Sequence, residues 1–388
     1  MKSLRVLLLL ALALPGAAAS MTRAADPLPP GVAPAAQAPI AMLVDLSSGQ
    51  VLYERRAGEG FLPASMTKAM TALVVFDLIK AGRLREDSVV TIRLETAARW
   101  AGKGTTLNLR GGEQVAVRDL LMGTTIVSAN DAAVALAEAA LGDTAAFVAA
   151  MNARAKGLGM VSSHFGTPNG FPDRAVTVVS AADLALLAQA LVTEHPQLYR
   201  RYIGQQAMNW RGVLLTSHDP FAGVLAGADG IKTGHTFEAG FNFLGSAVRD
   251  GRRLVVVIGR SPTEPGRAAA AKNLIEWGFT ALESRPFLTP EWIVGVVEVQ
   301  DGASREVAVA AARTITIAVR RGIAPRITAR IVYDGPVRAP IAKGAVVARL
   351  VVTGTGLPDH SIPLIATQAV GKAGPIDRLV NALLGLFG

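Results

Sequence analysis

The chain contains no cysteine among its 388 residues, so no disulfide bond can stabilise the fold and no oxidisable thiol is present. The stability of the protein must therefore come from a hydrophobic core. The sequence supplies one, because 51% of the residues are hydrophobic, which is enough for one large domain and a smaller one. The same abundance of apolar residues argues against disorder outside the ends of the chain.

Several functional motifs are also missing. The histidines lack metal-ligand spacing such as H-x-x-x-H, which argues against a zinc hydrolase, and we expect neither a metal nor a cofactor. We interpret four of them as surface or satisfied structural residues: His164, His195, His218 and His360. No G-x-S-x-G elbow surrounds Ser65, the serine of the first motif below, which argues against an α/β-hydrolase, and no phosphate-binding G-x-x-x-x-G-K-[ST] loop is found.

The charge balance is basic, with a net charge of +9 and a pI near 10.1. Anionic lipid headgroups and acidic cell-wall polymers are both compatible partners. Nucleic acid is not expected, because the sequence has no basic helix and no basic stripe interleaved with aromatic residues. The basic residues are scattered, so an ordinary solvated surface is the simpler interpretation.

The two ends of the chain read as targeting segments. Lys2 and Arg5 precede the apolar run Val6–Leu14, and a break with small residues follows it, so we expect a signal peptide at 1–19. The run is shorter than the ~20 residues that span a bilayer, although an uncleaved anchor is the alternative. The proline-rich segment 20–37 is predicted to be a linker.

The last segment, 371–388, is predicted to form an amphipathic helix that begins at Pro375. One face collects its apolar side chains: Ile376, Leu379, Val380, Leu383, Leu384 and Phe387. Such a helix suits a membrane interface. The alternative is that it packs on the domain before it.

Between these ends we predict two domains. Residues 38–284 place helices between an early hairpin and late strands, which indicates an α+β domain with an antiparallel sheet. Residues 285–370 carry short β-prone runs punctuated by turn residues, which indicates a small all-β sandwich. The strands expected in the first domain are Ala41–Asp45, Gln50–Glu54, Gly240–Arg249 and Arg252–Gly259. Its expected helices are Met66–Ala81, Val117–Gly123, Asp131–Ala140, Thr144–Lys156, Ala181–Glu194 and Arg267–Ala281.

Three short motifs carry the chemistry. They are Ser65-Met66-Thr67-Lys68, Ser128-Ala129-Asn130 and Lys232-Thr233-Gly234. Each is weak alone: Ser65 would otherwise be a helix N-cap, the second motif a capping turn, and the third a solvated strand end. Together, in this order and at these spacings, they are typical of serine acyl-enzymes that cut D-alanyl-D-alanine peptides or β-lactams.

The residue types fit that chemistry. Ser65 and Lys68 are three positions apart, so they share a helix face, and a serine needs a base to become nucleophilic. Lys68 can be that base only if burial and a second cation, for which Lys232 is the candidate, lower its pKa. Ser128 could relay a proton to the leaving amine, and the amide of Asn130 could bind the substrate carbonyl and the lysine.

The third motif is expected to bind substrate on a strand. Lys232 and Thr233 could hold a terminal carboxylate through charge-assisted hydrogen bonds. Gly234 would let the substrate backbone approach closely. The backbone N–H groups of Ser65 and His235 are candidates for an oxyanion hole.

On these residues the chain resembles the low-molecular-mass penicillin-binding proteins, specifically the D-alanyl-D-alanine carboxypeptidases with a C-terminal β domain. The similarity extends through most of the chain after position 38. It includes further stretches in family order: Pro63–Lys68, Thr167-Pro168-Asn169-Gly170, Asp229–Thr236 and Ala339–Gly344. The second motif, S-A-N, is closer to the S-G-N of carboxypeptidases than to the S-D-N of class A β-lactamases. The stretch Trp100–Leu107 is shorter than its family counterpart.

The resemblance implies a β-lactamase-like catalytic domain and removal of the terminal D-alanine from peptidoglycan pentapeptides through an acyl-enzyme, with covalent binding of β-lactams. It makes Ser65 the nucleophile, Lys68 the general base, and Ser128 and Asn130 the second catalytic element, with Lys232, Thr233, Gly234 and His235 binding substrate. It also implies a periplasmic location, with the terminal helix on the outer face of the inner membrane. The alternatives are a DD-endopeptidase or weak β-lactamase on the same scaffold, or a non-enzymatic cell-wall scaffold.

Overall fold

The computed structural model describes residues 38–290, 292–322, 327–354 and 357–375. The expected signal peptide and linker, and the expected terminal helix from 376 onward, lie outside the described residues. The described chain forms two compact units. One holds 38–46 and 53–279, and the other holds 47–52 and the residues from 280 on.

The first unit is built on a five-stranded sheet in the order β2-β1-β9-β8-β7. The strands are β1 (Ile40–Asp45), β2 (Gln50–Arg55), β7 (Ala228–Thr236), β8 (Gly240–Arg249) and β9 (Arg252–Ser261). The pairs β1–β9, β9–β8 and β8–β7 are antiparallel. Strand β7 lies at the edge of the sheet, and no other strand of the described residues pairs with its outer side. The third motif lies on this strand.

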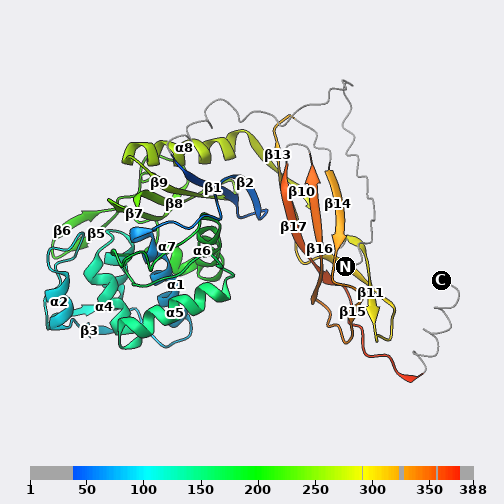
Figure 1. Ribbon diagram of the computed structural model, residues 1–388, viewed down its shortest axis with the longest axis horizontal. Helices are drawn as coiled ribbons and strands as arrows, with labels where there is room; N and C mark the ends of the chain where they lie inside the picture. The colour runs from blue at the N-terminus through cyan, green and yellow to red at the C-terminus, as the bar shows by residue number, and fades with distance from the viewer. Residues whose placement is uncertain (1–37, 291, 323–326, 355–356, 376–388) are drawn as a thin grey trace. The chain divides into compact units, whose positions relative to one another are not determined.

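Helices cover both faces of this sheet (Figure 1). The helix α8 (Glu264–Thr280) lies on one face, and the others pack beyond the opposite face. They are α1 (Thr67–Lys80), α2 (Leu94–Trp100), α3 (Val117–Thr125), α4 (Asn130–Leu141), α5 (Thr144–Gly157), α6 (Ala181–Glu194) and α7 (Pro196–Tyr202). Eleven of the fourteen residues of α1 are buried, so it is the central helix, as its nearly uniform apolar sequence predicts.

The sequence predicted the long elements of this unit well. The hairpin, the six helices and the two late strands are confirmed within a few residues. Ser180 is the N-cap of α6, and its hydroxyl accepts a hydrogen bond from the N–H of Asp183. Short elements were not predicted: α2, α7, and the strand pairs β3 (Val89–Thr91) with β4 (Gln114–Ala116) and β5 (Ala207–Trp210) with β6 (Val213–Thr216). Three to seven residues are too few to show a period.

The second unit is all β. A six-stranded sheet in the order β14-β16-β17-β12-β11-β15 and a two-stranded sheet β10-β13 enclose one hydrophobic core, which confirms the predicted β domain. Its strands are β10 (Leu282–Leu288), β11 (Ile293–Gln300), β12 (Glu306–Ala311), β13 (Ile315–Arg320), β14 (Ile327–Val332), β15 (Val337–Arg338), β16 (Val346–Gly354) and β17 (Leu357–Ala366). The sequence did not predict β10 and β15.

No single helix of the described residues is both long and apolar enough to cross a membrane. Among the residues that the structure describes, only α4 and α5 taken together meet that test, and the chain bends by 86° between them.

Candidate active site

Ser65 lies in a tight turn at the start of the central helix. The 3-10 turn Ala64–Met66 runs directly into α1, and Ser65 is half-buried while both its neighbours are buried. Ala64 has a φ of 49°, a left-handed conformation that costs free energy for a residue with a side chain. The turn therefore holds Ser65 at the positive end of the α1 dipole, where developing negative charge is favoured.

Lys68 is completely buried one turn further along α1. Its Nζ lies 2.8 Å from each of three oxygens: Ser65 Oγ, Asn130 Oδ1 and the backbone oxygen of Asn169. The two carbonyl oxygens can only accept hydrogen bonds, whereas the serine hydroxyl can donate or accept. A neutral amine satisfies all three contacts without any movement, by donating to the two carbonyls and accepting from Ser65.

The electrostatic surroundings favour that neutral form. Burial lowers the pKa of Lys68 well below its usual value, and the positive charge of Lys232 lowers it further, while Asp131 opposes the shift. The sequence prediction that Lys232 is the second cation is therefore supported by its position. A lysine so placed can accept the proton of Ser65.

The second motif is fixed at the start of α4 by a loop. The N–H of Asn130 donates to Thr105 O at 2.8 Å, and its side-chain amide donates to Lys103 O at 3.0 Å. Asp131, also buried, accepts from the N–H groups of Leu107 and Leu109 at 2.9 and 3.0 Å. The amide of Asn130 therefore has one orientation, with its oxygen toward Lys68. Ser128 adopts a φ of 66° just before this helix.

The third motif lies on edge strand β7. Lys232 is buried, and its Nζ donates to the oxygen of Thr233 at 3.0 Å. Burial lowers the pKa of Lys232 to about 7, opposed by the charge of Asp219 and aided by that of Arg267. Lys232 therefore changes between its charged and neutral forms near neutral pH.

Gly234 packs against the turn that carries Ser65. A Cβ on this residue would lie 2.2 Å from Pro63 O and 3.0 Å from Met66 N. The structure thus gives the glycine a role in packing β7 directly against the turn that carries Ser65. The expected approach of a substrate backbone to Gly234 stays a prediction.

A cleft of about 250 Å³ joins the motifs. Five of the eight predicted site residues line it: Ser65, Ser128, Thr233, Gly234 and His235. Lys68, Asn130 and Lys232 lie behind this surface as buried groups. The ring of His235 stacks on Phe241 with 3.9 Å between centroids. The structure therefore brings all eight predicted residues into one site.

The sequence reasoning missed several residues of the cleft. Arg267, on α8, lines it with only 4% of its side chain exposed, and its guanidinium pairs with Glu264 at 3.0 Å. His218 also lines it, and this histidine is exposed, which agrees with its interpretation as a surface residue. Burial and the charge of Lys232 lower the pKa of His218. The only signal for Asn169 was its place in the T-P-N-G stretch.

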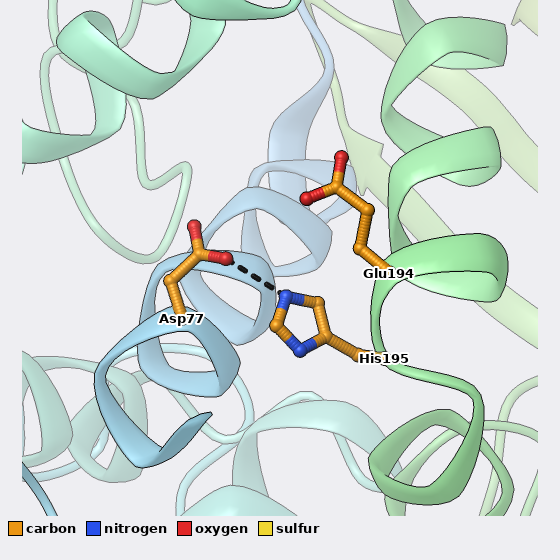
Figure 2. A group of neighbouring side chains, drawn as sticks. All are labelled: Asp77, Glu194 and His195. Carbon is orange, nitrogen blue, oxygen red and sulfur yellow. Dashed lines mark hydrogen bonds and ion pairs between the residues drawn. The ribbon is translucent and has the colours of Figure 1, made fainter. Parts of the chain in front are cut away.

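Another titratable cluster lies away from the cleft, where α1, α5 and α6 meet. His195 Nε2 lies 2.8 Å from Asp77 Oδ1, with Glu194 close by (Figure 2). The guanidinium of Arg154 forms ion pairs with both carboxylates. His195 is buried and its ring contacts Asp77, so the interpretation of His195 as a satisfied structural histidine is confirmed.

The fold and the site define a class of serine acyl-transfer enzyme, with a lysine-activated serine beside an edge strand. Comparison with known proteins identifies the family. Residues 28–262 match the model described as D-alanyl-D-alanine carboxypeptidase, and residues 283–372 match that of the penicillin-binding protein 5 C-terminal domain. The chain belongs to this carboxypeptidase family.

Individual relatives support the assignment over most of the chain. The D-alanyl-D-alanine carboxypeptidase DacD of Salmonella typhimurium is 33% identical over 89% of this chain and 90% of its own length. The crystal structure of penicillin-binding protein 5 from Haemophilus influenzae is 30% identical and has a TM-score of 0.75, covering 87% of this chain and 98% of that one. Penicillin-binding protein D2 of Listeria monocytogenes, solved in its ampicillin-bound form, is 31% identical with a TM-score of 0.56, covering 63% of this chain and 98% of that one.

Proposed function

We propose that the protein is a serine-type D-Ala-D-Ala carboxypeptidase that removes the terminal D-alanine from peptidoglycan pentapeptides. The observation that carries this proposal is the contact of Lys68 Nζ with Ser65 Oγ at 2.8 Å, in a buried site that lowers the lysine pKa. The family membership of the chain supports the same activity.

The reaction divides into two steps. In the first, neutral Lys68 takes the proton of Ser65, whose oxygen attacks the carbonyl of the penultimate D-alanine. The C–N bond breaks, the peptide remains as an ester on Ser65, and the leaving amine receives a proton through Ser128 or Lys68. In the second step a water molecule attacks the ester, which releases the shortened peptide and restores the Ser65 hydroxyl. The N–H groups of Ser65 and His235 are the candidate oxyanion hole.

The terminal carboxylate of the substrate is held at the other end of the cleft. Thr233 supplies a hydroxyl there, and Lys232 and Arg267 supply positive charge that is shielded from water. A carboxylate at this position gains charge-assisted hydrogen bonds. This requirement explains a preference for cleaving the last residue of a peptide, because an internal residue has no free carboxylate.

A β-lactam fits the same machinery. Attack of Ser65 on the lactam carbonyl opens the ring and leaves a covalent penicilloyl ester, while the carboxylate of the drug occupies the position of the substrate carboxylate. We therefore expect covalent labelling by penicillin.

The experiment is release of free D-alanine from a pentapeptide ending in D-Ala-D-Ala, by the chain from Ser20 onward and by its Ser65→Ala form. We expect release by the first and a loss of more than about a thousandfold in the second, because the nucleophile is gone. Penicillin labelling should disappear in the same variant. Labelling that persists at another residue would overturn the assignment of Ser65.

The alternatives need a separate assay. Cross-linked peptide dimers and a chromogenic β-lactam, tested beside the pentapeptide, measure endopeptidase and β-lactamase activity directly. We expect both rates to be small relative to carboxypeptidase turnover. A dimer rate equal to the pentapeptide rate would assign the protein as an endopeptidase.

We also propose that the enzyme acts in the periplasm, attached to the outer face of the inner membrane. The charged and apolar pattern of 1–19 and the apolar face predicted for 371–388 support this location. N-terminal sequencing of the exported protein should begin at Ser20. In a flotation assay the full chain should float with vesicles, and a chain that ends at Gly374 should not; equal behaviour would refute the anchor.

A further inference from the structure

His218 is a titratable residue of the catalytic cleft that has no part in the two steps above. It lies in the loop 217–227 between β6 and β7, and it lines the cleft together with Thr233 and Arg267. The residue is exposed, and within the described parts of the chain its imidazole has neither a hydrogen-bond nor an ion-pair partner. Its ring nitrogens are therefore available to a ligand in the cleft.

The backbone on the C-terminal side of His218 is fixed by its neighbours. Ser217 Oγ accepts a hydrogen bond from the N–H of Asp219 at 3.2 Å, and Asp219 Oδ1 accepts one from the N–H of Phe221 at 2.8 Å. Phe221 is buried and packs edge-on against Phe243 of β8, with 4.9 Å between the ring centroids. The loop therefore holds His218 at the cleft without using the imidazole itself.

The charged and titratable groups around His218 come from β7, from α8 and from its own loop: Lys232, His235, Glu264, Arg267 and Asp219. Partial burial and the charge of Lys232 lower the pKa of His218, and Arg267 lowers it further, while Glu264 opposes the shift. Burial also raises the pKa of the neighbouring Asp219 to about 6. His218 is therefore mainly neutral near pH 7 in the unliganded enzyme.

This end of the cleft can bind an anion with groups that are not yet satisfied. Arg267 pairs with Glu264, but its Nε is buried and has no hydrogen-bond partner among the residues that the structure describes. A substrate carboxylate beside Lys232 and Arg267 offsets the positive charges that keep His218 neutral. A negative charge next to an imidazole favours its charged form and so raises its pKa.

We propose that His218 is a further binding residue for the terminal carboxylate of the substrate, and that its imidazole takes up a proton from solvent when the carboxylate binds. The charged imidazole then donates a charge-assisted hydrogen bond to that carboxylate, beside Thr233 and Arg267. When D-alanine leaves after acylation it carries the carboxylate away, and His218 returns the proton to solvent. This inference rests on the proposed carboxypeptidase function and adds a pH-dependent residue to its substrate binding.

Calorimetry on the Ser65→Ala form measures the proton uptake without turnover. A pentapeptide ending in D-Ala-D-Ala is bound near pH 6 in buffers of different ionisation enthalpy, and the dependence of the binding enthalpy on the buffer gives the number of protons taken up. We expect roughly half a proton per peptide. A peptide amidated at its terminal carboxylate brings no charge and should cause almost no uptake. Adding His218→Gln should reduce the uptake by at least half, and the remainder belongs to Lys232 and Asp219.

The affinities give a second measurement. Binding that takes up a proton becomes stronger as the pH falls, so the affinity ratio of the carboxylate peptide to the amidated peptide should rise on acidification. His218→Gln should reduce this rise by about two- to fivefold, the size of one exposed ion pair. His218→Arg carries a permanent charge, so it should keep the ratio high above pH 7 and should also reduce the proton uptake.

His164→Gln is the matched control, because His164 is an exposed histidine that does not line the cleft. It should change neither the proton uptake nor the affinity ratio. An uptake that is the same with and without His218→Gln would overturn the inference. So would a His218→Gln variant that weakens the binding of both peptides by the same factor, since that result describes a structural role.

Failure of the proposed function has a different signature. In that case the Ser65→Ala form does not prefer the carboxylate peptide over the amidated one at any pH, whichever residue stands at position 218. A preference for the carboxylate peptide that is present but independent of His218 would leave the proposed function intact and refute this inference alone.

Discussion

A substitution of Asp131 tests the site, because its carboxylate stabilises the fold and also affects the pKa of Lys68. Its oxygens accept from three buried backbone N–H groups, those of Leu107, Leu109 and Ala132, at 2.9, 3.0 and 2.8 Å. Asp131→Asn keeps the shape but turns one oxygen into an NH₂ group, which leaves at least one N–H unsatisfied. Loss of a charged hydrogen bond and burial of an unpaired donor cost about 2 kcal/mol. For a domain of this size the melting temperature should fall by roughly 4–8 °C.

The same substitution destabilises the fold but favours the neutral, basic form of Lys68. The negative charge of Asp131 raises the pKa of Lys68, against the lowering by burial and by Lys232. Without that charge the pKa of Lys68 falls further, so a larger fraction of the lysine is neutral at any acidic pH. The rising limb of the pH profile for acylation should therefore move to lower pH, in a protein that is less stable.

The assay is the second-order rate constant for acylation by a fluorescent penicillin as a function of pH, with thermal unfolding of the same samples. Asp250→Asn is the control, because Asp250 is exposed in the β8–β9 turn and Asn-Gly suits such a turn as well as Asp-Gly. It should change neither quantity. A limb that moves to higher pH in Asp131→Asn, or an unchanged melting temperature, would refute the reasoning.

Three further predictions concern the cleft and the scaffold. In the unaltered enzyme kcat/KM should rise with pH as Lys68 loses its proton and fall near pH 7 as Lys232 loses its proton. With a peptide amidated at its terminal carboxylate, the fall in kcat/KM should be absent. A kcat/KM that does not change with pH would exclude a lysine base. Gly234→Ala should slow penicillin acylation more than tenfold, because its Cβ must move β7 away from Pro63 O; an unchanged rate would contradict that packing role. Asp143→Ala removes the N-cap of α5 and should destabilise the protein by about 1 kcal/mol without changing acylation, as urea unfolding and labelling would show.

The sequence predicted those parts of the site that follow from local geometry. The spacing of Ser65 and Lys68 places both on one face of a helix, and the structure gives a 2.8 Å contact between them. The long apolar runs predicted the central helix, which is apolar nearly all round and therefore buried, and the late strands. The family resemblance then predicted that the three motifs form one site for a single substrate.

The remainder depends on contacts that leave no local pattern. Asn169 reaches Lys68 through its backbone oxygen, and every residue type has such an oxygen. Arg267 lies within a predicted helix, but nothing in the helix pattern says that its side chain lines the cleft. The packing of Gly234 against Pro63 O is a contact between segments far apart in the sequence. Such residues become visible only when distant segments are brought together.

The proposed reaction needs a neutral Lys68 and a protonated Lys232. Burial is the largest cause of a lowered pKa at both, so neither holds its proton as a free lysine does. Asp219 favours the cation at Lys232, whose pKa is about 7, whereas the charge of Lys232 disfavours the cation at Lys68 and the charge of Asp131 favours it. The state with one proton, a neutral base beside a cation for the substrate carboxylate, is the one that acylation requires. A substrate carboxylate next to Lys232 stabilises that cation further, so substrate binding extends this state to higher pH.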